Sequence, residues 1–380
     1  MKKEIFTALL VGRNQNILLA LPHLLSRAGF SIDVITSFYA LKYSLFIDQF
    51  TFIPAAKPLV QAISKAIEKQ YDWIIVTEEE ILQEVMDSSL SLEIKLRILP
   101  VLGVEHFPHL NSKTALSQIF AAHGIKTPLF HIVHNAQEAF LVAARLGYPV
   151  LLKKDASSGG GGIVECLAPS DFKTISSGFF DRKVLVQKKI EGEVLDLSAL
   201  FFEGQLIHFN YARQEKTTSG KFGPSSLRTY RALPFVEESF FCELSQIGKA
   251  LGINGFSNIT AIRQSDGNCF YIEADARPNA WLDFPRFLGE DISLRIRDWF
   301  SERKILRYPI QAYPRQSRQK VLPYYLRLKA WEILFNRYRV WRYIPMNDRK
   351  LVAFLLVRMM GRWLFRRAFK ILKKSLFDKT

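Results

Sequence analysis

One nine-residue stretch, residues 271–279, constrains this chain most, because it places three charges at alternate positions of a strand-like sequence. Alternate residues of a strand point the same way, so Glu273, Asp275 and Arg277 are expected to project together. Two carboxylates this close repel each other unless a cation lies between them, and Mg2+ prefers oxygen ligands. An arginine beside them suits a phosphoryl group. An edge strand with solvated charges would show the same pattern. Other segments of the chain are needed to distinguish a metal-binding strand from such an edge strand.

A run of four glycines, at positions 159–162, follows an apolar, strand-like segment at 148–153. Such a run stabilises neither helix nor strand, but it lets backbone N–H groups wrap around a polyphosphate. Lys153, at the end of the apolar segment, would place a cation over the same phosphates. The spacing does not match a Walker loop. A flexible turn remains the alternative for the glycine run taken alone.

Together these segments resemble the ATP-grasp superfamily of carboxylate-activating ligases, which includes biotin carboxylase, carbamoyl phosphate synthetase and D-alanine–D-alanine ligase. Four segments carry the resemblance in the order that the family has them: 111–128, 148–162, 184–192 and 270–277. The similarity covers roughly residues 4–300. Residues 195–200 are most similar to the carboxylate-amine ligase group.

The resemblance implies a mixed α/β and α+β fold in which an open parallel α/β domain, the pre-ATP-grasp domain, spans residues 1–108. The ATP-grasp domain, 109–300, would consist of a small lid subdomain at about 127–190 and a large subdomain at about 191–300. The strand, helix and strand patterns at 5–11, 17–27 and 32–36 independently favour a parallel sheet at the start.

The resemblance also implies ATP and Mg2+, or Mn2+, as cofactors, and assigns roles to individual residues. The nucleotide-binding residues would be Lys113, Lys153, Gly159, Gly160, Gly161, Gly162, Gln187, Lys188, Ile190 and Asp196. The metal ligands would be Glu273, Asp275 and Thr260, and the catalytic residues Arg277 and Arg213. Arg213 is preferred among the cations of an expected loop at 211–230, because it leaves the preceding strand.

Two positions depart from the family pattern. Val194 stands where the family usually has an acid for the ribose hydroxyls, so Asp196, on the same face of the strand, is expected to take over. Thr260 stands where the family has a Glu, Asp or Gln metal ligand, while Asp275 replaces the usual Asn and restores one negative charge. Glu78, Glu79 and Glu80 follow another strand, where open α/β sheets bind ligands; a solvated helix start is the alternative.

The function implied is an ATP-dependent ligase that joins a small-molecule carboxylate to an amine through an acyl phosphate. A non-catalytic ATP-binding or scaffold protein at a membrane is the alternative if Thr260 and Val194 have disabled the site. A carboxylase is a weaker third candidate, since no biotinyl or bicarbonate feature can be singled out. The sequence does not identify the acid, the amine or the oligomeric state.

The C-terminal region, residues 301–380, lies outside the resemblance and is expected to be a basic helical extension. From position 295 onward there are 23 Lys and Arg against 5 Asp and Glu, whereas residues 1–294 have 29 against 31. Seven cations fall within one half of a helical wheel: Arg358, Arg362, Arg366, Arg367, Lys370, Lys373 and Lys374. This pattern at 349–377 predicts an anchor on an anionic membrane surface. A helix packed on the body is the alternative, and nucleic-acid binding is the least favoured.

Three widely spaced cysteines give neither a disulfide framework nor a zinc site, which favours a reducing compartment. The seven-residue apolar run at 5–11 is too short for a signal peptide and lacks a cleavage site. We therefore expect a cytoplasmic protein, peripheral on the inner face of the cytoplasmic membrane.

Overall fold

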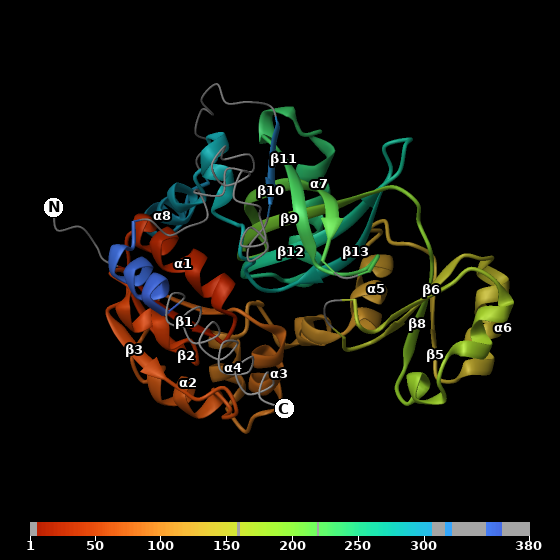
Figure 1. Ribbon diagram of the computed structural model, residues 1–380, viewed down its shortest axis with the longest axis horizontal. Coiled ribbons are helices and arrows are strands. Elements are labelled where there is room, and N and C mark those ends of the chain that lie inside the picture. Colours follow the sequence, from red (N-terminus) through yellow and green to blue (C-terminus); the bar gives the residue numbers. More distant parts are fainter. Residues whose placement is uncertain (1–5, 158–159, 219, 306–315, 321–346, 359–380) are drawn as a thin grey trace, which may run out of the picture.

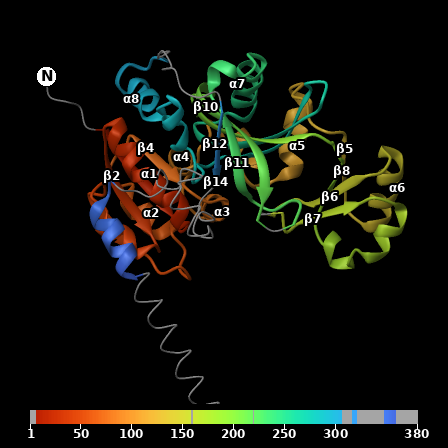
Figure 2. The same cartoon turned by 45° about the horizontal axis from the view of Figure 1, so that its top comes forward.

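The computed structural model describes residues 6–157, 160–218, 220–305, 316–320 and 347–358. They form three parts, which Figure 1 shows side by side: an N-terminal α/β domain, a large antiparallel sheet with its helices, and a smaller lid subdomain. Figure 2 shows α5 (Lys113–Ala122) between the large sheet and the lid. Among the described residues, no helix is long and apolar enough to cross a bilayer.

The N-terminal domain is the open parallel sheet that the sequence predicts. Its strand order is β3-β2-β1-β4, and all its pairings are parallel. Its elements are β1 (Phe6–Gly12), α1 (Gln15–Ala28), β2 (Phe30–Thr36), β3 (Gln49–Phe52), α2 (Val60–Ala66), β4 (Trp73–Val76), α3 (Glu79–Asp87) and α4 (Leu92–Ile98). Asn14 caps α1 by accepting hydrogen bonds from two backbone N–H groups, and Gly29, at φ 99°, ends it in the left-handed conformation.

The lid subdomain is a four-stranded antiparallel sheet with one covered face. Its strand order is β5-β8-β6-β7, and its elements are β5 (Phe130–Val133), α6 (Ala136–Leu146), β6 (Val150–Lys154), β7 (Ile163–Cys166) and β8 (Val184–Lys188). Val150, Leu152 and Val186 are buried in the core beneath α6. Strand alternation therefore turns Lys153 and Gln187 to the other face.

The large subdomain is a six-stranded antiparallel sheet in the order β13-β12-β9-β10-β11-β14. Its strands are β9 (Glu193–Phe202), β10 (Gln205–Thr217), β11 (Ser225–Arg231), β12 (Gly255–Arg263), β13 (Cys269–Asp275) and β14 (Gln316–Lys320). One face is apolar and packs on α5 and α7 (Ser239–Leu251), with Leu197, Phe209 and Ile259 in the core. The opposite face carries polar residues.

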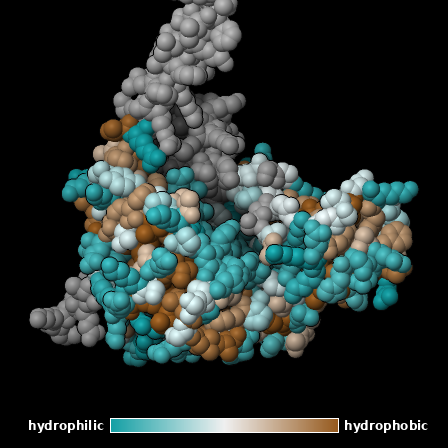
Figure 3. Space-filling view, turned by 90° about the horizontal axis from the view of Figure 1, so that it is seen from below, coloured by the Kyte–Doolittle hydropathy of each residue, from teal (hydrophilic) through white to brown (hydrophobic). Residues whose placement is uncertain are grey.

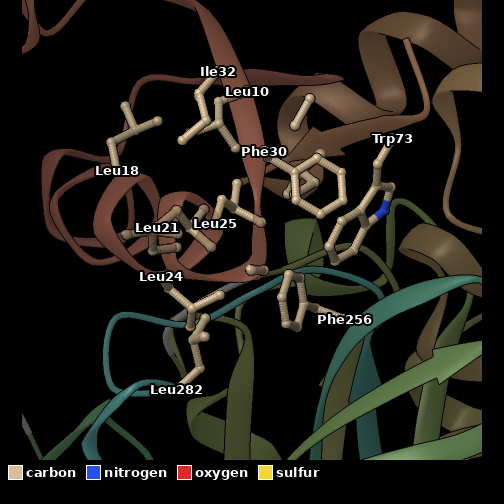
Figure 4. Close-up of a cluster of buried hydrophobic side chains, with 14 of the residues drawn as sticks. Leu10, Leu18, Leu21, Leu24, Leu25, Phe30, Ile32, Trp73, Phe256 and Leu282 are labelled. Atoms are coloured by element: carbon tan, nitrogen blue, oxygen red, sulfur yellow. The ribbon is translucent and has the colours of Figure 1, made fainter. Parts of the chain in front are cut away.

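The N-terminal domain and the large subdomain share one hydrophobic core, which holds the two parts together. Figure 4 shows leucines of α1 beside Phe30 and Trp73 of the N-terminal sheet and Phe256 of β12. The rings of Trp73 and Phe256 stack with centroids 5.1 Å apart. The helix α8 (Ile292–Glu302) adds Trp299 to the same core and packs against α1.

The C-terminal region differs from the predicted helical extension. Residues 316–320 form the strand β14, which pairs with β11 at the edge of the large sheet. Residues 349–358 are helical and pack on the N-terminal domain through buried Leu351 and through Phe354, whose ring stacks on Tyr43 at 4.2 Å. The rest of the predicted membrane anchor, 359–377, lies outside the described residues.

Candidate active site

The polar face of the large sheet carries the predicted metal strand. Cross-strand pairing aligns Glu273, Thr260 and Asp196 in one row, on β13, β12 and β9. A second row aligns Asp275 and Asn258. Because directly paired residues share a face, these side chains lie on the side opposite the apolar core. The predicted metal ligands are therefore brought together, and Asp196 joins them.

The carboxylate of Asp275 lies within a buried charge cluster. Burial raises the pKa of Asp275 well above its usual value, and repulsion from Glu273 raises it further. Arg277 opposes this effect, because its Nη2 lies 3.1 Å from Oδ2 of Asp275. Burial alone would lower the pKa of Arg277, but Asp275, Glu79 and Glu273 raise it instead.

Glu79, one of the three adjacent acids that the sequence places at a strand end, is a member of the site. Nε of Arg277 donates to Oε1 of Glu79 at 2.5 Å, which ties the metal strand to the first turn of α3. Its neighbour Glu78 instead accepts hydrogen bonds from the backbone N–H groups of Arg13 and Asn14. Of the three adjacent acids, Glu79 thus points to the site and Glu78 to a turn of its own domain.

Lys153 reaches the same cluster from the lid. Its side chain is buried, at 5% exposure, and burial lowers its pKa to about 8. Glu273 acts in the opposite direction and raises the pKa, whereas Lys113 lowers it. Lys153 of the lid sheet and Glu273 of the large sheet therefore face one another across the two subdomains, closely enough to interact electrostatically.

Lys113 and the glycine run complete the side of the site that faces the lid. Lys113 begins α5, and its ammonium donates to the backbone oxygen of Ser157, just before the glycines. Gly160 has a φ of +79°, and a Cβ added there would lie 2.3 Å from the carbonyl oxygen of Phe222. Only glycine allows this approach of the lid to the loop between β10 and β11. Residues 158–159 lie outside the described part of the chain.

An ion pair also joins the lid to that loop. Nζ of Lys221 lies 2.8 Å and 3.0 Å from the two carboxylate oxygens of Glu165 on β7. Figure 3 shows the lid projecting at the right, with mostly hydrophilic side chains on the part of the body beside it. The two subdomains therefore make contact at the glycine run.

The three predicted hinge residues have different surroundings. Gln187 is 1% exposed, and its amide nitrogen has no hydrogen-bond partner in the described part of the chain. Lys188 points to the other face of β8, where its ammonium donates to the carbonyl of Gly147 at 2.7 Å. Ile190 lies in the connection from β8 to β9 and is half-buried. Gln187 therefore shares the face of the lid sheet that carries Lys153.

The expected loop at 211–230 is largely a hairpin, and this changes the assignment of its arginines. Arg213 lies on β10 beside Leu195, on the opposite face from Asp196, and it pairs with Glu193 at 3.0 Å and Glu215 at 2.8 Å. The placement expected for Arg213 was therefore wrong, because strand alternation turns it away from the site. Arg228 on β11 lies on the site face instead.

Asp196 is also placed differently from the expectation that it serves the ribose hydroxyls. Its carboxylate is buried and lies 2.7 Å from Nη2 of Arg228. The amide of Gln214 donates to its other oxygen at 3.2 Å. Alternation along β11 would have placed Arg228 on the site face, had this segment been recognised as a strand. The sequence did not show how far the two strands of the hairpin extend.

Glu273 and Asp275 fit a divalent cation in part. Their mutual repulsion and the raised pKa of Asp275 indicate excess negative charge that a cation would relieve. The described residues contain no group of three acidic, histidine or cysteine side chains suited to hold a metal ion. Mg2+ is commonly held by one or two carboxylates together with substrate phosphates, so two carboxylates suffice when a nucleotide supplies the remaining oxygens.

A lid with a buried lysine and a glycine run, beside a sheet that carries neighbouring carboxylates, resembles the arrangement of ATP-grasp proteins, and the comparisons support this resemblance. No family model matches the chain. It is 23% identical over 176 residues to the D-alanine–D-alanine ligase of Geobacter sulfurreducens, a match that covers 44% of this chain and 55% of that protein. The D-alanine–D-alanine ligase of Bordetella pertussis is 31% identical over 90 residues, which is 23% of this chain and 28% of that protein. The matches thus span about half the length of the curated relatives, or less.

Solved structures support the same fold over most of the chain. The biotin carboxylase domain of the Hydrogenobacter thermophilus 2-oxoglutarate carboxylase, in complex with MgADP and bicarbonate, superposes with a TM-score of 0.65 at 18% identity, covering 83% of this chain and 74% of that one. An L-amino acid ligase from Bacillus licheniformis gives a TM-score of 0.59 at 15% identity, covering 85% and 81%. The mixed fold expected from the sequence is therefore confirmed.

Proposed function

We propose that this chain is a Mg-ATP-dependent ligase that joins a small carboxylic acid to an amine through an acyl phosphate. The observation that carries the proposal is the arrangement of the site, in which the buried Lys153 of the lid faces the carboxylates that β13 carries on the polar side of the large sheet. A cation and a carboxylate facing each other across two sheets can grip opposite ends of a metal–triphosphate. The relatives named D-alanine–D-alanine ligase and L-amino acid ligase support the same class of reaction.

In this mechanism, Lys113, Lys153 and the backbone of Gly160 to Gly162 bind the phosphates, and Gln187 contacts the base. Glu273 and Asp275 would hold Mg2+, which supplies charge neutralisation of the phosphates when it is bound. The substrate carboxylate attacks the γ-phosphate in line. Arg277 stabilises the negative charge that spreads over the transferring phosphoryl group. The amine then displaces phosphate from the acyl carbon, so no nucleophile from the protein is needed.

The proposal is tested by measuring phosphate release from ATP with pooled carboxylic acids and amines, followed by mass spectrometry of the products. We expect release that requires both an acid and an amine, with a product whose mass equals their sum minus water. Release that is independent of both pools would contradict the ligase proposal. Splitting each pool then identifies the two substrates.

A non-catalytic ATP-binding protein is the second candidate, and Thr260 is the observation that favours it. Thr260 lies between Glu273 and Asp196 in the row where a third metal ligand is expected, and a hydroxyl is a weaker ligand than a carboxylate. Nucleotide binding without phosphate release in any pool would support this candidate.

We further propose that the chain works in the cytoplasm, peripherally attached to an anionic membrane surface through the basic end of residues 349–377, since the start of this segment packs on the N-terminal domain. Leu356 and Val357, at the end of the described helix, are 49% and 69% exposed. The sequence beyond them is strongly basic. Each cation near an anionic leaflet contributes about 1 kcal/mol, so several together with an apolar face would hold the protein there reversibly.

Flotation with lipid vesicles tests this attachment. The full chain is compared with a chain ending at Arg358, which keeps β14 and the helix that packs on the N-terminal domain. We expect the full chain to float with anionic vesicles, and the shorter chain to partition at least about 100-fold more weakly. Neutral vesicles should bind neither. Equal flotation of the two chains would remove the membrane proposal and leave the ligase proposal untouched.

A further inference from the structure

The polar face of the large sheet contains a second cluster, in which hydrogen-bond donors outnumber acceptors. Arg228 is 2% exposed, and its Nε and Nη1 have no partner among the described residues. Its guanidinium carbon lies 3.5 Å from the ring centroid of Trp281. The indole nitrogen of Trp281, at the edge of this stack, is also buried and without a partner in the described structure.

The strand β14 adds a third polar group. Ser317 pairs with Tyr230 of β11, so it shares a face with Arg228, which is two residues from Tyr230. Its side chain is 5% exposed, and its hydroxyl has no partner within the part of the chain that is described. Ser317 and Arg228 are thus diagonal neighbours across two adjacent strands, a separation that a long side chain can bridge.

The chemistry of these groups indicates what is missing. Arginine and tryptophan nitrogens only donate hydrogen bonds, and a buried donor without a partner lowers the stability of the fold. Oδ2 of Asp196 forms an ion pair with Nη2 of Arg228 but has no hydrogen-bond partner among the described residues, and Gln214 donates to Oδ1 of Asp196. Neither residue therefore supplies an acceptor to Nε or Nη1 of Arg228. A ligand that complements this cluster must therefore bring acceptor oxygens, and a negative charge suits the guanidinium.

The cluster lies close enough to the predicted metal strand for one small molecule to reach both. Asp196, which contacts the guanidinium, is two strands away from Glu273 in the same row. Two strand spacings amount to roughly 10 Å, which a small molecule can span. Ala212 occupies the next position in the row on β10, and its small side chain leaves room for Arg228 to reach Asp196.

We propose that Arg228, Trp281 and Ser317 form a subsite for the oxyanion of a substrate, either a carboxylate or a phosphate group remote from the bond that is made. Asp196 and Gln214 are positioning residues, because they hold the guanidinium rather than contact the ligand. As part of the ligase, the subsite deepens the proposed function and rests on it. As an anion-binding site, it can be tested without nucleotide.

The test follows thermal unfolding of the full chain during titration with acetate or with inorganic phosphate, at constant ionic strength and without ATP. We expect saturable stabilisation by at least one anion. A response to acetate alone identifies the remote group as a carboxylate, and a response to phosphate alone identifies it as a phosphate. Arg228→Lys should weaken the response at least about 100-fold, because lysine has one point charge and cannot stack.

A gentler variant keeps the test valid if Arg228→Lys does not fold. Trp281→Phe keeps the aromatic stack but removes the N–H group, so we expect about tenfold weaker anion binding. Arg213→Met removes an arginine from the opposite face of β10 and should leave the response unchanged. Inorganic phosphate is also attracted by Lys113 and Lys153, so the quantity that reports on the subsite is the part of the anion response that Trp281→Phe weakens. Lys153→Met should keep that part of the response.

The proposal is overturned if neither anion stabilises the wild-type chain saturably, since water would then be what satisfies these donors. It is also overturned if Lys153→Met loses the response while Trp281→Phe keeps it. Anion binding that depends on Trp281, in a chain that neither binds nor turns over ATP, would instead refute the ligase proposal and leave the subsite standing.

Discussion

Glu273→Gln is expected to lower ATP-dependent phosphate release at least about 1,000-fold while the fold is retained. The substitution preserves size but removes the charge that faces both Lys153 and the predicted metal. Charge stabilisation around a transferring phosphoryl group supplies most of the catalysis in such reactions, so its loss has a large effect. The measurement compares the rates of phosphate release by the wild type and by Glu273→Gln, under saturating Mg-ATP and with the acid and amine identified from the pools.

The same variant has an expected effect on folding that serves as its control. Removing the charge of Glu273 relieves its repulsion with Asp275 but also removes its attraction to Lys153 and Arg277, so the melting temperature should change little. Glu68→Gln, at an exposed position of the N-terminal domain, controls for the chemical change and should keep full turnover. Turnover of Glu273→Gln within tenfold of the wild type would contradict the role given to Glu273.

Lys153→Met is expected to abolish turnover and yet to stabilise the nucleotide-free protein at neutral pH. Burial lowers the pKa of Lys153 from 10.5 to about 8, so the folded chain binds this proton more weakly than the unfolded chain does. The charged amine therefore costs stability below pH 8, by up to about 3 kcal/mol. The cost diminishes as the pH rises from about 8 to 10.5, because the amine then loses its proton in the unfolded chain as well.

Denaturant unfolding at pH 7 and near pH 10.5, combined with phosphate release, tests both parts of this prediction. The free energy of unfolding of Lys153→Met should exceed that of the wild type at pH 7, and the difference should shrink at the higher pH. Phosphate release should fall at least about 100-fold, because the cation over the phosphates is lost. Lys249→Met, at an exposed position of α7, should change neither quantity. A destabilised variant with normal turnover would show that Lys153 has a packing role only.

The shared face of the two carboxylates of the metal strand could be predicted from the sequence, because strand alternation is a local property. Residues 271–277 are spaced so that Glu273 and Asp275 must share a face, and the structure has them there. The same rule failed at Arg213, where the sequence does not show how far the strands of the hairpin extend. An error in the assumed end of a strand changes which side chains are predicted to face the site. For this reason the sequence predicted Arg213 as a site residue, whereas the structure has Arg228 on that face.

Contacts between distant segments could not be derived from local patterns. The pairing of Arg277 with Glu79 joins residues nearly two hundred positions apart, and it depends on the core that Trp73 and Phe256 share between domains. The role of β14 in the large sheet was hidden in the same way, since the surrounding sequence is basic and was read as helical.

By itself, the sequence determined the parallel sheet of the N-terminal domain, the cation and carboxylates of the site, and the family resemblance, since these depend on patterns within short stretches of the chain. The tertiary structure alone decided which faces meet: it set Lys153 opposite Glu273, turned Arg213 away, and enclosed Arg228 between Asp196 and Trp281. The physical reason is that burial and pairing across strands depend on the packing of the whole sheet, which no short stretch of residues specifies.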